Sequence, residues 1–361
     1  MKKPLLKTLS LFAVLTLILT LFAACVAPAP AVSQPAQGSQ TDGSTFSVHF
    51  IDVGQADAAL VECDGEYMLI DGGNRADSNL IYSVLQREGV NRLSILVATH
   101  AHEDHIGGLP GAFNYATADL TLCPVTEHNS GVFKTFAQYA EEKGGGITVP
   151  AVGDTYRLGS ATVVILGVNG GEDTNDTSII LKITYGSTSF LFTGDAEGPA
   201  EETVLNSGAD LSATVLKVGH HGSAGSTSYR FLREIMPEYA VISVGTDNSY
   251  GHPTEEALSR LRDAGAKVYR TDLQGDIYVT SDGETVTVTT DRNSQSDTLG
   301  TAAPTITPEP REYVLNTSSR KFHLPDCSGL EKMNPDNRKD YTGTAEELME
   351  MGYTPCGSCE P

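Results

Sequence analysis

The sequence predicts a layered α/β domain that is preceded by an export signal and followed by a small second module. Short apolar runs bounded by Gly, Asp and Asn begin at Phe46 and recur to Thr290, as is typical of strands. Apolar residues at helical spacing separate some of them, as in Ser78–Glu88, where Gly89 is a favourable helix stop. Many strands joined by surface helices favour stacked layers around sheets.

The expected elements follow from these two periodicities. Strands are expected at residues 46–53, 58–63, 67–70, 93–98, 161–166, 178–184, 189–193, 213–218, 240–244, 267–271, 276–280 and 285–290. Helices are expected at residues 78–88, 135–143, 197–206, 228–235 and 254–264. These elements define one domain over residues 45–292. A linker over residues 293–310, rich in Ser, Thr, Pro and Gly, separates it from a module over residues 311–361.

Residues 1–24 have the pattern of a secretory signal peptide, with lysines at the start and an apolar run from residue 9. The run ends in Leu21-Phe-Ala-Ala-Cys25, which is similar to a bacterial lipobox and implies lipid attachment at Cys25. The alternative is an uncleaved transmembrane anchor. Either case places the rest outside the cytoplasm, on the extracellular face of the cell membrane. Residues 25–44, rich in Ala, Pro, Gln and Ser, predict a flexible stalk.

The chain is strongly acidic. Its formal charge is −22, and because residues 1–24 carry three lysines and no acid, removing them gives −25. Such a charge keeps an exported protein soluble but repels polyanions. The composition therefore argues against a simple nucleic-acid-binding module.

The segment His100-Ala-His102-Glu-Asp104-His105 predicts a metal site. It follows a buried strand directly, so the two alternating histidines can converge on one cation, while Asp104 and His105 point toward an adjacent one. Four ligand-type side chains within six residues at a strand end are hard to explain as a solvated polar loop.

This HxHxDH segment resembles the signature of the metallo-β-lactamase superfamily. Further segments resemble the hydrolase domain of the DNA-uptake protein family ComEC, in the same order along the chain. They are Phe50-Ile-Asp-Val-Gly-Gln-Ala-Asp57, Ile70-Asp-Gly-Gly73, Asn175-Asp-Thr-Ser178, Phe192-Thr-Gly-Asp195, Leu216-Lys-Val-Gly-His-His-Gly-Ser223 and Tyr250-Gly-His-Pro253. The resemblance covers residues 47–290.

The resemblance implies a four-layer αββα sandwich with two divalent metal ions, Zn or Mn, at one sheet edge. His100 and His102 would bind the first ion, Asp104 and His105 the second, and Asp195 would bridge both. His220 or His221 would supply the next ligand. Since successive strand residues point to opposite sides, we expect one of them to bind metal and the other to face substrate or pack.

Catalytic roles are expected for Asp104, His252 and Lys217. His252 is expected to bind the phosphate or protonate the leaving group, although it is also compatible with a turn before Pro253. Lys217, next to the paired histidines, is the best-placed cation for a substrate phosphate, but it could equally point away from the site.

The sequence departs from the family where many members have another histidine ligand, since the loop here contains Asn175 and Asp176. That loop is a candidate for metal or substrate contact, and its departure implies a weaker or differently occupied first site. The one histidine in this interval, His128, is expected on a surface loop. Asp71 is expected to orient a ligand histidine, and Asp57 either does the same or stabilises a turn.

The last 51 residues contain two short pairs of metal ligands, His323 with Cys327 and Cys356 with Cys359. A structural Zn held by these four would stabilise a module with little apolar core. The segment resembles small Ada-type zinc-binding modules. The alternative is a disulfide between two of the cysteines. Cys63 and Cys123 are expected to be buried free thiols.

These features predict a metal-dependent phosphodiesterase, in the first place a nuclease that cleaves extracellular DNA or RNA by metal-activated hydroxide attack. One alternative is a cell-envelope phosphoryl-ester hydrolase similar to teichoic-acid phosphorylcholine esterase, although Trp, which favours choline binding, is absent. The other is a non-catalytic surface binding protein. The expected partners are a phosphodiester substrate and, through Cys25, the membrane.

Overall fold

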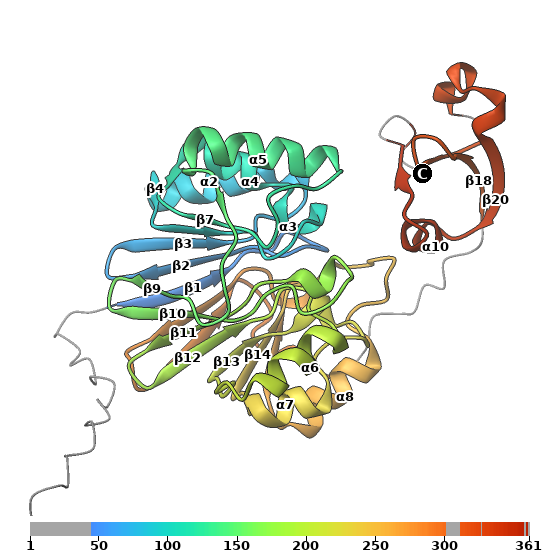
Figure 1. Ribbon diagram of the computed structural model, residues 1–361. Helices are drawn as coiled ribbons and strands as arrows, with labels where there is room; N and C mark the ends of the chain where they lie inside the picture. The colour runs from blue at the N-terminus through green and yellow to red at the C-terminus, as the bar shows by residue number, and fades with distance from the viewer. Residues whose placement is uncertain (1–44, 301–310, 326, 357–358, 360–361) are drawn as a thin grey trace, which may run out of the picture. The chain divides into compact units, whose positions relative to one another are not determined.

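The computed structural model describes residues 45–300, 311–325, 327–356 and 359 (Figure 1). The predicted signal peptide, the stalk, Cys25 and residues 301–310 of the predicted linker lie outside the described residues. None of the helices in the described part of the chain combines the length and the hydrophobicity that a membrane span requires.

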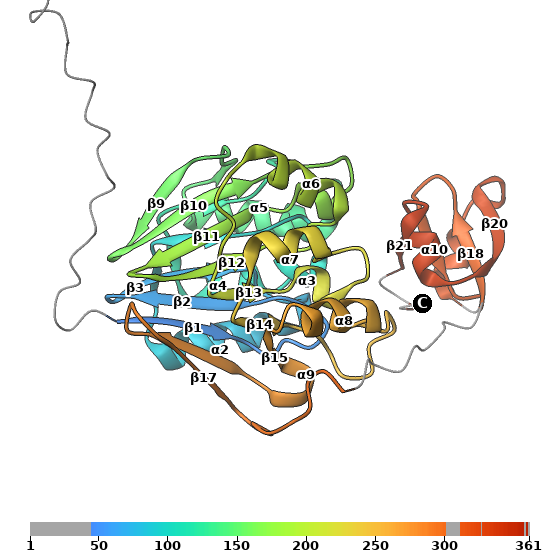
Figure 2. The same cartoon turned by 90° about the horizontal axis from the view of Figure 1, so that it is seen from below.

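The first sheet has the strand order β17-β16-β1-β2-β3-β5-β7-β8. Its strands are β1 (Phe46–Phe50), β2 (Ala59–Cys63), β3 (Glu66–Ile70), β5 (Ile95–Val97), β7 (Thr121–Leu122), β8 (Ile147–Thr148), β16 (Ile277–Ser281) and β17 (Val286–Thr290). After the strands of the second sheet, the chain returns to this first sheet, where β16 pairs antiparallel with β1 (Figure 2). From β3 to β8 the pairing is parallel.

The second sheet has the order β15-β14-β13-β12-β11-β10-β9. Its strands are β9 (Thr155–Leu158), β10 (Ala161–Gly167), β11 (Ile180–Tyr185), β12 (Thr188–Phe192), β13 (Val215–Lys217), β14 (Tyr239–Ile242) and β15 (Lys267–Arg270). Strands β12 to β15 run parallel, while β9 to β12 form an antiparallel meander.

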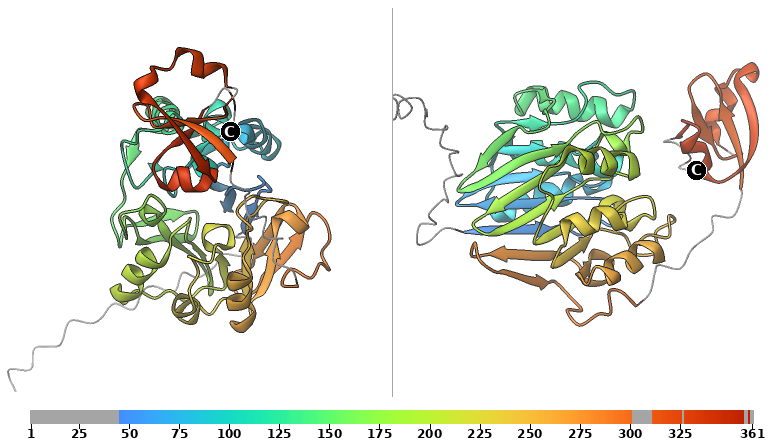
Figure 3. Two further views of the ribbon diagram at one scale, coloured as in Figure 1. Left: turned by 90° about the vertical axis from the view of Figure 1, so that its right-hand side faces the viewer. Right: turned by 60° about the horizontal axis from the view of Figure 1, so that its bottom comes forward.

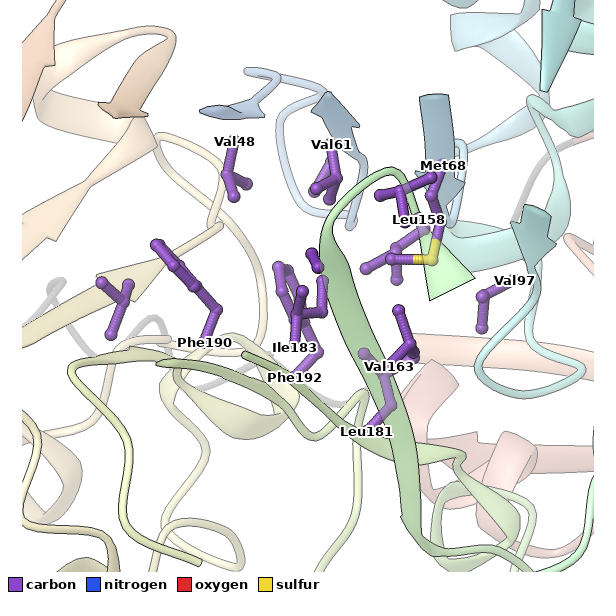
Figure 4. Packing of buried hydrophobic residues seen from close by; sticks show 14 of the residues in the cluster. Val48, Val61, Met68, Val97, Leu158, Val163, Leu181, Ile183, Phe190 and Phe192 are labelled. Atoms are coloured by element: carbon purple, nitrogen blue, oxygen red, sulfur yellow. The ribbon is translucent and has the colours of Figure 1, made fainter. Parts of the chain in front are cut away.

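The main core lies between the two sheets. Figure 4 shows Val48 and Val61 of the first sheet pointing toward Phe190 and Ile183 of the second. All four side chains are at most 1% exposed. At about 25 cal/mol per Å² of buried apolar surface, this layer supplies the main favourable contribution to folding.

Helices cover the outer face of each sheet (Figures 1 and 3). Apolar side chains of α2 (Ser78–Glu88), α4 (Leu109–Tyr115) and α5 (Gly131–Lys143) pack on the first sheet. Those of α6 (Gly198–Ser207), α7 (Tyr229–Ile235) and α8 (Glu255–Asp263) pack on the second. The predicted αββα sandwich is confirmed. The short helix α4 was not among the predicted elements, because its Pro and Gly masked the helical pattern.

One edge of the sandwich collects the polar side chains. Asp71, Thr99, Asp195 and the His220-His221 pair follow the carboxyl ends of β3, β5, β12 and β13, respectively. Parallel neighbours end at the same sheet edge, so these residues converge although they are far apart in sequence.

Residues 311–356 contain a separate four-stranded sheet with the order β20-β18-β19-β21. It comprises β18 (Arg311–Asn316), β19 (Lys321–His323), β20 (Arg338–Gly343) and β21 (Thr354–Pro355), with the helix α10 (Ala345–Glu350). Its buried apolar cluster consists of Tyr313, Leu315, Phe322 and Leu348. Such a small cluster gives this module little hydrophobic stabilisation of its own.

Candidate metal centre

The loop after β5 places the first group of histidines. Thr99 anchors this loop, because its backbone N–H and its hydroxyl donate to Asp71 at 2.8 and 2.7 Å. The chain then turns into the short helix α3 (Glu103–Ile106), which carries Asp104 and His105. His100 and His105 are fully buried, whereas His102 is partly exposed.

Asp195 lies at the centre of the site. Its Oδ2 is 3.2 Å from His105 Nε2 and 3.7 to 3.9 Å from ring nitrogens of three more histidines, His221, His220 and His100. Gly194, at φ +52°, makes the turn that aims this carboxylate. A Cβ at Gly194 would lie 2.9 Å from atoms of Ser178 and Thr99, so only glycine fits there.

The candidate ligand atoms form two groups, and the Asp195 carboxylate belongs to the first of them. Asp104, His105, Asp195 and His221 each offer one atom, and these atoms lie within 4.8 Å of one another. Beside them, His100 Nε2 and His102 Nδ1 face each other at 3.0 Å. The first group matches the second predicted metal position, extended by His221, and the pair matches the first position.

The chemistry of these groups fits divalent cations. Asp195 Oδ1 and His105 Nε2 are buried without a hydrogen-bond partner in the described structure, as expected for atoms that bind an ion. Burial opposes the charge of Asp195, but the neighbouring histidines outweigh it and hold the pKa of this carboxyl well below its usual range. Burial and the charge of His105 lower the pKa of His100, which keeps its ring neutral and able to bind metal.

The paired histidines do not behave as predicted. His220 and His221 lie on a tight turn after β13 rather than on a strand, with φ of +47° and +52°. Both rings therefore reach Asp195, whereas alternation along a strand would have separated them. His221 also lies 3.3 Å from Asp104 Oδ2, and its Nδ1 donates to the Ser243 carbonyl at 2.9 Å.

Behind the site, Asp71 and Asp57 support the ligand histidines. Asp71 Oδ2 accepts from His105 Nδ1 at 2.8 Å, which is the hydrogen bond expected of it. Asp57 Oδ1 is 3.3 Å from His221 Nδ1. A hydrogen bond to Asp71 thus orients His105, whereas His221 is oriented by the Ser243 carbonyl with the Asp57 charge close by, and the Nε2 atoms of both rings face the candidate cation site.

The contacts of Lys217 do not support the catalytic role predicted for it. Its Nζ lies 2.7 Å from Asp57 Oδ2 and donates to the Val218 carbonyl at 2.9 Å, and its side chain is only 4% exposed. The residue is the last of β13, where its side chain extends inward between the sheets. This orientation agrees with the alternative that the sequence left open, in which Lys217 points away from the site.

Asp176 is likewise not a ligand. Its Oδ1 accepts from the backbone N–H of Glu197 at 3.0 Å and of Ala200 at 3.4 Å, so it caps the start of α6. Asn175 precedes it in a single 3-10 turn, and its Oδ1 is buried without a partner in the described residues. Asp176 therefore has a structural role at the start of α6, while a metal or substrate contact of Asn175 stays a prediction.

A family model described as "Metallo-beta-lactamase superfamily" matches residues 51–246, more than half of the chain. The chain belongs to this superfamily. It is therefore a hydrolase of the metal-dependent kind, and the fold implies divalent metal ions at the centre described above.

The chain is also similar to individual bacterial proteins, including one named as a competence protein. The chain is 30% identical over 254 residues to "ComE operon protein 3" of Bacillus subtilis and 32% identical over 228 residues to "Competence protein ComA" of Neisseria gonorrhoeae. These matches cover 65% and 62% of this chain but only 33% and 30% of the relatives. Among solved structures, the metallo-beta-lactamase fold protein YhfI from Bacillus subtilis is 14% identical, with a TM-score of 0.46, over 66% of this chain and all of that one.

His252 lies beside the superfamily site. Its ring centroid is 5.5 Å from that of His220, and its Nδ1 is buried with no hydrogen-bond partner among the described residues. Gly222, at φ +85°, lets the two loops meet, since a Cβ there would lie 2.6 Å from Pro253 Cβ. Burial and the charges of His220 and His221 lower the pKa of His252 to about 3. In the metal-free protein the ring is therefore neutral at neutral pH.

One residue of the site, Glu197, was missed in the sequence. Glu197 accepts from His220 Nδ1 at 2.8 Å and had no motif to reveal it beyond its place two residues after Asp195. His128 lies on a loop, as expected, and lines a groove of about 540 Å³ with Lys134 and Phe133. Burial and the charge of His102 lower the pKa of His128.

In the C-terminal module the four predicted ligands come together. His323 Nδ1 is 3.4 Å from Cys327 Sγ, which is 4.0 Å from Cys356 Sγ, and Cys359 completes a group within 4.8 Å. The cysteines of the described residues form no disulfide with one another. Three sulfurs and one nitrogen form a donor set that suits zinc.

Proposed function

We propose that this chain is a metal-dependent phosphodiesterase and that its substrates are polynucleotides, either DNA or RNA. The observation that carries the proposal is the single buried carboxylate of Asp195, faced by nitrogens of four histidines, with Asp104 beside them. Such a donor set accommodates two cations that share one carboxylate, an arrangement found in enzymes that cleave phosphoryl esters.

The chain's own residues have defined tasks in this proposal. His100, His102, Asp104, His105, Asp195 and His221 would hold the cations, which supply Lewis-acid activation of water and neutralise charge on the phosphoryl oxygens. His252, neutral and next to His220, would donate a hydrogen bond to a phosphate oxygen. Asp71 and Asp57 keep the ligand rings in place.

The names of two relatives support a polynucleotide as substrate, since one refers to competence and the other, "Recombination protein 2" of Haemophilus influenzae, refers to recombination, a process in which DNA is handled. The acidic charge of the chain acts against such a substrate. The chain itself carries a formal charge of −22, and Lys217 is already paired with Asp57. Binding of a polyanion would therefore depend on the cations, and it should weaken as salt rises.

The test is an activity assay on the chain loaded with Mn²⁺ or Zn²⁺. Single-stranded DNA, RNA, bis-p-nitrophenyl phosphate and a phosphorylcholine ester are offered in parallel, with the chelator-treated protein as control. Cleavage of a polynucleotide that requires the metal supports the proposal. A loaded protein that leaves every polynucleotide intact but hydrolyses the phosphorylcholine ester is instead an envelope esterase.

We also propose that the chain acts at the extracellular face of the cell membrane, anchored by lipid at Cys25. The lipobox-like sequence before Cys25 and the stalk-like composition after it support this location. A diacylated cysteine would anchor stably. Cys25→Ser should move the protein from the membrane fraction into the medium, whereas unchanged retention would indicate an uncleaved helix.

A further inference from the structure

Tyr250 carries an exposed aromatic ring beside the candidate metal centre. Its side chain is 48% exposed. Its ring centroid lies 5.7 Å from that of His252, with 27° between the two planes, so the rings are stacked. The His252 ring lies 5.5 Å from that of His220, whose Nε2 is 3.8 Å from Asp195 Oδ2. Three rings in succession thus connect the central carboxylate with solvent.

The loop that carries Tyr250 is tied to the metal centre by hydrogen bonds. The buried side chain of Asn248 accepts from the backbone N–H of His252 at 3.0 Å and donates to its carbonyl at 2.6 Å. Further along, the backbone N–H of Thr254 donates to the carbonyl of Gly222, next to the histidine pair, at 2.9 Å. These contacts fix the loop relative to the turn after β13.

Two other tyrosines are exposed among the described residues, and both lie elsewhere. Tyr229 belongs to α7, outside the second sheet, and its hydroxyl donates to Asp263 at 2.7 Å. Tyr278 belongs to β16 and stacks on His49, which is in none of the candidate ligand groups. Tyr250 is therefore the exposed tyrosine of the described residues that stacks on a residue of the site.

An exposed aromatic ring beside a phosphodiester site suits a nucleobase. Every base has a π-face, and stacking of one base on an aromatic side chain strengthens binding about 5- to 150-fold. Stacking needs no net charge, so the formal charge of −22, which repels phosphates, does not oppose it. Bases in a duplex are already stacked on their neighbours, so such a ring selects an unpaired base.

We propose that Tyr250 is a stacking platform for an unpaired base of the substrate, and that the substrate class is single-stranded polynucleotide. The base would lie on the Tyr250 ring while the adjoining phosphate reaches His252 and the cations. Tyr250 is thus a specificity-determining residue that takes no part in the chemistry. The inference rests on the proposed function, because it requires a polynucleotide substrate.

The first test uses the absence of tryptophan from the chain, since Tyr250→Trp introduces a single fluorescent reporter. The metal-loaded variant is titrated with a single-stranded oligonucleotide whose phosphorothioate linkages resist cleavage, and with an abasic strand of the same length. We expect the strand with bases to quench the emission and the abasic strand to leave it nearly unchanged. Tyr229→Trp is the matched control and should respond to neither strand.

The second test compares KM values for cleavable strands with and without bases. In Tyr250→Ala the KM for the strand with bases should rise about 5- to 150-fold, toward the KM for the abasic strand. Tyr250→Phe keeps the ring and should remain close to the wild type, as should Tyr229→Ala. Melting curves show whether each variant is folded.

Several results would overturn the inference. These are an unchanged KM for the strand with bases in Tyr250→Ala, and an emission of Tyr250→Trp that does not respond to bases. An equal rise in KM for both strands in Tyr250→Ala would show that Tyr250 acts only by positioning His252. A wild-type protein that cleaves both strands with the same KM contradicts this inference alone, whereas one that cleaves neither strand contradicts the proposed function as well.

Discussion

Asp195 Oδ2 lies 3.2 Å from His105 Nε2, while Asp195 Oδ1 has no hydrogen-bond partner in the described residues. A buried carboxylate with one oxygen beside a ligand histidine and the other unpaired is suited to bind two ions at once. Its backbone N–H donates to the Ser178 hydroxyl at 3.1 Å, which helps to fix the position of this residue.

The first prediction concerns this carboxylate. Asp195→Asn keeps the shape but removes the charge that two cations would share, so we expect loss of bound metal and a fall in diester turnover of about a hundredfold or more. Elemental analysis and turnover of bis-p-nitrophenyl phosphate measure the two effects. Asp210→Asn, at an exposed carboxylate paired with Lys182, should change neither. Full metal content and activity in Asp195→Asn would contradict a bridging role.

The second prediction tests whether Lys217 has a structural role or binds substrate. The Lys217 and Asp57 side chains are 4% and 6% exposed, and their charged atoms lie 2.7 Å apart. Lys217→Met leaves a buried carboxylate without its partner, which should lower the free energy of unfolding by about 3 to 5 kcal/mol. Urea denaturation measures this. The double variant Lys217→Met/Asp57→Asn should recover part of the loss, because the unpaired charge is then removed.

A role of Lys217 in substrate binding would give a different result. If Lys217 bound a substrate phosphate, Lys217→Met would raise the KM for a polynucleotide while leaving the unfolding free energy unchanged. The contacts of Lys217 Nζ with Asp57 and the Val218 carbonyl favour the structural role.

Much of the fold could be predicted because its signals are local. The expected helix over 78–88 coincides with α2, since apolar spacing and the stop at Gly89 are both encoded in neighbouring residues. The first strand was expected to reach Val53 but ends at Phe50, because Asp52 N–H donates to Asp276 instead of continuing the ladder. That contact joins residues more than two hundred positions apart, which no local pattern reveals.

The residues of the candidate site could be predicted where sequence motifs mark them. They could not be predicted where packing decides the direction of a side chain. The HxHxDH segment and Asp195 were found because their residue types are rare outside metal sites. The directions of Lys217 and Asp176 were not, since each side chain finds its partner on another element, Asp57 before β2 and Glu197 before α6. The turn that brings both His220 and His221 to Asp195 needs left-handed backbone that non-glycine residues rarely adopt.

The third prediction concerns pH. In the metal-free protein, burial lowers the pKa of His221, but Asp195 and Asp57 outweigh it and raise the pKa from 6.5 to about 10. Because the folded-state pKa exceeds the unfolded value, this stabilisation is complete below pH 6.5 and is lost as pH rises through about 10. Urea denaturation with chelator should give lower stability at pH 10 than at pH 6. His221→Asn should flatten this dependence, and an equal slope in that variant would contradict the assignment.

The fourth prediction is that the stabilisation by added metal grows as pH rises, whereas the stability of the metal-free protein falls. A cation competes with the protons on His105, His220 and His221, all of which have raised pKa values in the metal-free protein. The increase in stability that added metal provides should therefore be small at pH 5 and grow toward pH 8. Thermal melting with and without Mn²⁺ at the two pH values measures it, and a metal effect independent of pH would contradict binding at these histidines.

The last prediction concerns the C-terminal module, whose buried apolar cluster has only four side chains. A zinc ion held by His323, Cys327, Cys356 and Cys359 would supply the missing stability, and four protein ligands would leave no open position for catalysis. Cys327→Ser should therefore remove one zinc equivalent and increase amide hydrogen exchange across 311–356, while turnover of bis-p-nitrophenyl phosphate stays within about twofold. Cys63→Ser, at a buried thiol that belongs to none of the candidate ligand groups, should keep all the zinc. Loss of turnover in Cys327→Ser, with amide exchange in residues 45–292 unchanged, would assign the module a part in catalysis.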